Sequence, residues 1–145
     1  TQPVAAEREA SLPTPPRETQ ILRYLINVTD AAELENPESS SYKAAKWLAN
    51  EDPLQLPPDA DNLVQRYILA SFHIQTTQVQ PWLSCNRPET AENATCQYEK
   101  LVGAFPDLVY ERISWFRWMS GVHECEWAGV FCDESNQTRA LDLSA

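Results

Sequence analysis

Apolar side chains recur at three- and four-residue spacing along much of the chain, which is the spacing that gathers them on one face of an α-helix. Ile21, Leu22 and Leu25 show this spacing near the N-terminal end. The stretch from Asp61 to Gln75 has the broadest apolar face, so we expect its helix to supply most of the core. The pattern predicts about five helices, over residues 17–28, 37–52, 61–75, 98–105 and 108–119, the last two separated at Phe105-Pro106.

The pattern changes near the C-terminal end, where it predicts two short strands. Neighbouring residues alternate between two faces in the runs 130–132 and 141–143. The polar residues 133–137 between these runs are typical of a turn. A hairpin over residues 129–143 is the economical interpretation. The expected fold is therefore mainly α, with about five helices closed by a short β-hairpin.

The first sixteen residues differ from the rest, because they contain four of the eleven prolines and no periodic apolar pattern. We expect residues 1–16 to form an extended arm. Residues 17–145 would then form one domain, which is long enough to bury a real hydrophobic core.

A motif of cysteine, tryptophan and glycine marks the predicted hairpin. It reads C-x-W-x-G-V-x-C and consists of Cys125, Trp127, Gly129, Val130 and Cys132. Leu141-Asp142-Leu143 follows, and with Thr138 in the first position it fits the L-x-x-L-x-L pattern of leucine-rich repeats. The region resembles the N-terminal cap that precedes such repeats in plant and algal leucine-rich-repeat proteins. The resemblance is specific over residues 118–143, looser over residues 37–85, and absent from residues 1–20.

The four cysteines form two local pairs in the sequence, Cys85 with Cys96 and Cys125 with Cys132. Three disulfide connectivities are possible in principle, and both proximity and the cap resemblance favour the local pairs. A zinc site is the alternative, but its usual C-x₂₋₄-C spacing is absent. Disulfides predict an oxidising, non-cytosolic compartment, secretory or extracellular, with a thylakoid-associated location in a plastid as the alternative. No run approaches the roughly eighteen apolar residues of a membrane span, so at most a peripheral membrane association is expected.

Three Asn-x-Thr sequences, at Asn27, Asn93 and Asn136, are possible N-glycosylation acceptors. They agree with passage through the secretory route, although they can also be ordinary polar loop residues. Asn27 lies within the first predicted helix, so it is the least favourable of the three acceptors.

The chemistry available to the chain is narrow. A formal net charge of −10, without a basic patch, disfavours nucleic acids and anionic membranes as partners. Three glycines do not suffice for a phosphate-binding loop. The two histidines, His73 and His123, are far apart in the sequence, and we interpret His73 as a structural residue of the longest helix. We therefore assign no catalytic, cofactor-binding or metal-binding residue and expect no small-molecule substrate.

Aromatic residues are dense between Ile113 and Met119, and they have two interpretations. They can fill the core, or they can anchor a partner protein, since tryptophan and tyrosine are enriched in interface hot spots. The candidate interface residues are Trp115, Trp118, Trp127, Leu141 and Leu143. A strand edge over residues 141–143 would have to be covered by a loop or by a neighbouring protein.

These features favour a non-catalytic structural or protein-interaction module whose partners are other protein subunits. If residues 1–145 are the complete mature protein, we expect an accessory subunit of a larger complex, for instance a photosynthetic membrane complex of an alga. If repeats follow, the chain would instead cap a secreted or cell-surface leucine-rich-repeat receptor-like protein. A small hydrolase that uses exposed carboxylates is the alternative from another class.

Overall fold

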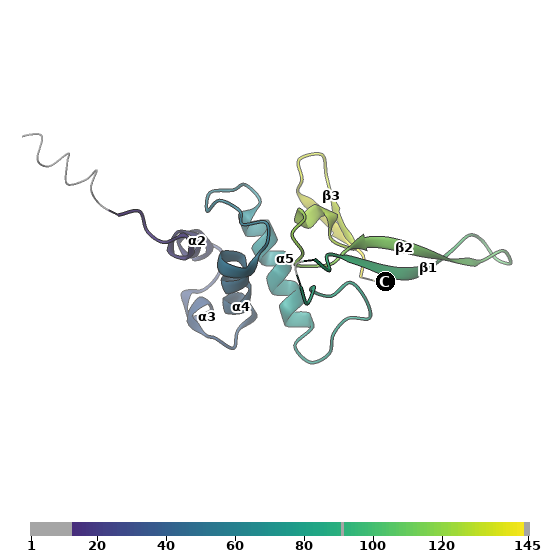
Figure 1. Cartoon of the computed structure of the whole chain (residues 1–145), viewed down its shortest axis with the longest axis horizontal. Helices are drawn as coiled ribbons and strands as arrows, with labels where there is room; N and C mark the ends of the chain where they lie inside the picture. Colours follow the sequence, from purple (N-terminus) through teal and green to yellow (C-terminus); the bar gives the residue numbers. More distant parts are fainter. Residues whose placement is uncertain (1–12, 91, 144–145) are drawn as a thin grey trace, which may run out of the picture.

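In a computed structural model, the described residues are 13–90 and 92–143. Most of the predicted arm, residues 1–12, lies outside the described residues, and residues 13–16 have no regular secondary structure. Figure 1 shows helices at one end of the molecule, a long two-stranded hairpin projecting at the other end, and a second hairpin between them.

Four α-helices are present in the described residues: α2 (Arg17–Leu25), α3 (Ala31–Glu35), α4 (Ser40–Lys46) and α5 (Leu63–Thr76). A π-helical turn, Trp47–Glu51, continues α4. The helices predicted over residues 17–28 and 61–75 are confirmed as α2 and α5, whereas α3 was not predicted. The Ser39 hydroxyl accepts a hydrogen bond from the Tyr42 N–H, so α4 begins at Ser40 and not at Pro37. None of these helices is long and apolar enough to cross a membrane.

Two of the predicted helices are strands in the structure. β1 (Thr95–Val102) and β2 (Val109–Phe116) form an antiparallel pair, with Thr95 opposite Phe116 and Val102 opposite Val109. The prediction of a mainly α fold with about five helices is therefore wrong: the described residues contain four α-helices and two two-stranded antiparallel sheets. β2 is rich in β-branched and aromatic residues, which fit a pleated surface. Gly103 follows β1 with φ of +101°, a conformation that favours glycine and helps the chain to reverse.

The predicted C-terminal hairpin is confirmed. β3 (Val130–Cys132) pairs with β4 (Thr138–Leu141) in an antiparallel sheet, with an irregular register between Phe131 and Cys132. The Asp133 carboxylate accepts hydrogen bonds from the Ser135 and Gln137 N–H groups and so closes the turn.

Both favoured disulfide pairs are present. Cys85 is bonded to Cys96 and Cys125 to Cys132, with Cα–Cα distances of 5.2 and 5.7 Å. Two disulfides are consistent with an oxidising compartment.

One hydrophobic core joins the helices to both hairpins. As predicted, α5 contributes more buried residues than any other described helix. It runs through the middle of the molecule, between the other helices and the hairpins (Figure 1). The largest fully buried hydrophobic side chains outside α5 are those of Trp118, Trp127, Ile21, Leu25 and Leu48.

Candidate functional site

Arg66, on the buried face of α5, is the centre of an interior hydrogen-bond network. Its Nε and Nη2 atoms donate to the two carboxylate oxygens of Asp52 at 2.6 and 2.7 Å. Its Nη1 atom donates to the Val122 carbonyl and its Nη2 atom to the Ser120 carbonyl, each at 2.7 Å. The side chains of Arg66 and Asp52 have no exposed surface. The network therefore joins three segments of the fold and is not accessible to a ligand.

Two tryptophans enclose the same guanidinium. The guanidinium carbon of Arg66 lies 5.3 Å from the ring centroid of Trp47 and 4.8 Å from that of Trp127, within the range of cation–π contacts. Trp118 packs against Trp127 and donates its indole N–H to the Ala128 carbonyl at 2.7 Å. Trp118 and Trp127 are almost completely buried, so neither side chain is accessible to a partner in this structure.

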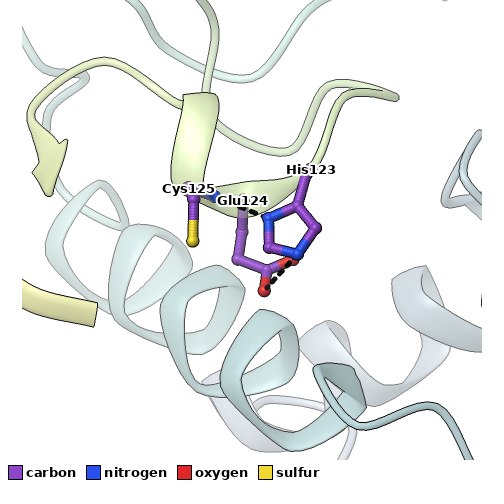
Figure 2. Close-up of side chains that lie close together, drawn as sticks. All are labelled: His123, Glu124 and Cys125. Carbon is purple, nitrogen blue, oxygen red and sulfur yellow. Dashed lines mark hydrogen bonds and ion pairs between the residues drawn. The ribbon is translucent and has the colours of Figure 1, made fainter. Parts of the chain in front are cut away.

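His123, Glu124 and Cys125 form a compact group beside this network (Figure 2). Their potential metal-ligand atoms lie within 4.8 Å of one another, and no other such group occurs among the described residues. Cys125 is bonded to Cys132 and has no thiolate to offer a metal ion. The His123 Nδ1 atom accepts the Cys125 N–H at 3.1 Å, and this contact starts the short 3-10 helix Glu124–Glu126. The arrangement is that of a helix cap and a disulfide, and it does not fit a metal site.

Glu124 is buried, and both of its carboxylate oxygens already accept hydrogen bonds. Asn62 donates to Oε1 at 2.9 Å, and Gln65 donates to Oε2 at 2.8 Å. Arg66 lies 3.7 Å from Oε1. These partners come from α5 and the residue before it, so Glu124 attaches the C-terminal segment to the central helix and is not placed to act on a substrate.

His73 is another buried titratable group on α5. Its Nε2 atom accepts the Arg87 N–H at 3.3 Å, and its ring lies edge-on to Trp82 with a centroid separation of 4.4 Å. Burial lowers the pKa of His73 to about 4, so the imidazole is neutral at physiological pH. This geometry supports the structural interpretation of His73.

The end of the β1–β2 hairpin carries a cluster of exposed apolar side chains, which we call the hairpin tip. Its members are Leu101, Phe105, Leu108, Val109 and Tyr110. Phe105 is 88% exposed and Tyr110 is 72% exposed. Leu101 lies opposite Tyr110 across the two strands, so these two side chains share one face. The tip stands away from the rest of the molecule (Figure 1). The sequence pattern predicts helices in this segment and does not indicate the tip.

The strands below the tip carry charges that are paired across the hairpin. Arg112 lies 3.9 Å from Glu99, its register partner, and Lys100 is opposite Glu111. The four charges of these two pairs sum to zero, although the whole chain carries −10, and Asp107 adds one negative charge in the turn of the hairpin. The apolar tip therefore lies next to a polar but locally neutral stem.

The three other candidate interface residues are more accessible than Trp118 and Trp127. Trp115 is half-buried, because it stacks on Tyr98 and meets Phe131 edge-on. Leu141 and Leu143 are 40% and 43% exposed, at the C-terminal hairpin. Leu143 also lines an apolar hollow of about 280 Å³.

The three possible glycosylation acceptors are all exposed. Asn27 lies after α2, which ends at Leu25, so the expectation that this asparagine is inside a helix is wrong. Asn93 precedes β1, and Asn136 lies in the turn between β3 and β4.

Comparisons with protein-family models, with curated proteins and with solved structures each found no match for this chain. The resemblance to leucine-rich-repeat caps therefore stays a prediction. The candidate site with the strongest structural basis is the exposed hairpin tip.

Proposed function

We propose that this protein is a non-catalytic interaction module that docks onto a partner protein through the hairpin tip, as an accessory subunit of a larger assembly. The observation that carries the proposal is the exposure of Phe105 and Tyr110 at the end of a projecting hairpin. The groups that most often perform catalysis have other roles here. His73 is buried and neutral, both carboxylate oxygens of Glu124 accept hydrogen bonds from neighbouring side chains, and the described cysteines are in disulfides.

The energetics favour a partner that covers the tip. Transferring a large apolar side chain from water into an interface stabilises it by roughly 1.5–3 kcal/mol. Phe105 and Tyr110 together would then contribute about 3–6 kcal/mol before the entropic cost of association. Aromatic anchors surrounded by a polar rim are the usual arrangement of an interface hot spot. The paired charges of Glu99 and Arg112 supply such a rim below the tip.

A protein surface suits this tip better than a lipid surface. Basic residues that accompany membrane-inserting apolar groups increase affinity for anionic lipids. Here the stem is neutral and the chain carries −10, which opposes approach to an anionic bilayer. We therefore expect an apolar groove on a folded partner as the binding site of the tip.

Native fractionation of extracts from the cells that make this protein tests the proposal. The unchanged chain should elute with a larger complex, and the double variant Phe105→Ala/Tyr110→Ala should elute as the free subunit. Val79→Ala is the matched control, because Val79 is a fully exposed apolar residue outside the tip. Its elution should not change.

Two results would contradict the docking function. One is that the double variant still elutes with the complex. The other is that the purified chain binds phosphatidylcholine or phosphatidylserine vesicles and loses this binding in the double variant.

A second function, capping of a leucine-rich-repeat array, is favoured by a different observation. β4 pairs with β3 alone in the part of the chain that the structure describes, and Leu141 and Leu143 remain partly exposed. The apolar hollow beside Leu143 is also lined by the more exposed Trp82 and Leu83. A following repeat could add a strand to β4 and fill this hollow.

The coding sequence that follows Ala145 tests the capping function. Capping requires L-x-x-L-x-L repeats in phase with Leu141 and Leu143, so that their strands continue the sheet from β4. A stop codon directly after Ala145, or a following sequence without such repeats, would exclude it.

A further inference from the structure

We propose that Asn27, Asn93 and Asn136 each carry an N-linked glycan, which places the protein in the secretory route and not in a plastid. The inference goes beyond the docking function and does not depend on it. Its basis is the position of the three acceptors in the fold, together with the two disulfides that already indicate an oxidising compartment.

All three asparagines lie at the surface, outside the helices and strands. Asn27 follows the C-terminal end of α2, Asn93 precedes the first residue of β1, and Asn136 lies in the β3–β4 turn. Asn136 has φ of +59°, a left-handed conformation that asparagine tolerates better than most residues. A glycan is bulky and polar, so it can be carried only where the side chain points to solvent. Each acceptor meets this condition.

The amide nitrogen of each acceptor is available for the new bond. Glycan transfer joins Nδ2 to the first sugar carbon of a lipid-pyrophosphate-linked oligosaccharide. The bond from that carbon to the pyrophosphate oxygen breaks, the amide loses one proton, and the lipid pyrophosphate leaves. Among the described residues, no hydrogen bond is donated by the side-chain amide of Asn93 or of Asn136. Asn27 donates only a long one, 3.4 Å to the Arg23 carbonyl, and the remaining amide hydrogen can keep it.

A glycan on Asn27 would also explain an exposed apolar patch at the end of α2. Tyr24, Ile26 and Val28 surround this asparagine in the sequence and are 46%, 55% and 51% exposed. Apolar groups that cluster on a surface invite association unless something covers them. A sugar chain anchored between Ile26 and Val28 would cover this patch without a protein partner.

The acceptors are arranged so that glycans would leave the hairpin tip free. One lies at the helical end of the molecule, one at the base of the β1–β2 hairpin and one at the β3–β4 turn (Figure 1). No acceptor sequence occurs between Thr95 and Phe116. The three glycans would therefore cover other surfaces and leave the tip accessible.

Peptide mass spectrometry of the protein purified from its natural cells tests the inference. Treatment with peptide:N-glycosidase in ¹⁸O-labelled water converts each glycosylated asparagine to labelled aspartate. The expected result is labelled aspartate at positions 27, 93 and 136. An unmodified amide at any one position overturns the assignment of that site, and unmodified amides at all three overturn the secretory placement.

Variants of the third residue of each acceptor provide the control for a secreted, recombinant form of the full chain. Thr95→Ala should remove one glycan and increase the gel mobility by one step, whereas Thr95→Ser should leave the mobility unchanged. The same pair of changes at Thr29 is useful because its hydroxyl is 2.8 Å from the Tyr67 hydroxyl, and serine preserves this contact. Equal mobility of the alanine and serine variants overturns glycosylation at that acceptor. The hairpin-tip variants keep all three acceptors, so this result and the docking test can fail separately.

Discussion

Arg66 lies within reach of two buried carboxylates, those of Asp52 and Glu124. It donates two hydrogen bonds to Asp52 and lies 3.7 Å from Glu124. Moving ionised groups out of water costs several kcal/mol each, and this cost is offset only when every group keeps its partners. We therefore expect Arg66 to tolerate replacement poorly.

Arg66→Met should lower the free energy of unfolding by about 3–5 kcal/mol, because Asp52 would remain buried without its ion-pair partner. Denaturant unfolding followed by tryptophan fluorescence measures this change. Arg112→Met is the matched control: Arg112 is 68% exposed and its contact with Glu99 is long, so the expected change is within about 0.5 kcal/mol. A similar, small change in both variants would show that the Arg66 network does not stabilise the fold.

At the scale of the elements, the two hairpins differ in how well the sequence predicts them. The β3–β4 hairpin has local signals, namely the turn residues 133–137 and the cysteine pair around Gly129. The β1–β2 hairpin has a misleading local signal, because apolar residues of β1 and the following turn have helical spacing. These residues are Tyr98, Leu101, Val102 and Phe105. A strand is stabilised by its cross-strand neighbours, which the pattern of one segment does not contain. The predicted fold class was wrong because the pairing of β1 with β2 is not visible in the pattern of either segment alone.

Gly129 is the glycine on which the β3–β4 hairpin depends most directly. Its φ is +79°, and a Cβ at this position would lie 2.0 Å from the Asp142 carbonyl oxygen. Gly129→Ala should therefore lower the free energy of unfolding by more than about 2 kcal/mol, measured by thermal or denaturant unfolding.

Gly129→Asn separates the effect of the positive φ from the effect of the close contact with Asp142. Asparagine adopts positive φ more readily than alanine but has the same Cβ. We expect the asparagine variant to be destabilised almost as much as the alanine variant. Recovery of wild-type stability in Gly129→Asn would show that the close approach to Asp142 is not the dominant constraint.

At the scale of the whole molecule, the sequence predicted the parts that are held by local interactions. It correctly indicated α2, α5, the C-terminal hairpin and both disulfides. It did not indicate the meeting of Arg66, Asp52 and Glu124, because Asp52 lies 14 residues from Arg66, and Asn62 bonds to Glu124 across 62 residues. It also missed the hairpin tip, since the exposure of Phe105 follows only from the hairpin's projection away from the core.

The network around Arg66 has a consequence for how this molecule folds. Its hydrogen bonds join Arg66 on α5 to Asp52, which follows α4 and its π-helical turn, and to the segment before β3. All three segments must be in place together. A partly folded state would bury a charge without a partner, at a cost of several kcal/mol. The helices and the C-terminal segment should therefore form one cooperative unit. The hairpin tip contributes nothing to that network, so it can open locally while this unit stays folded. The element that we propose for docking is thus free to adjust to a partner without weakening the interior that supports it.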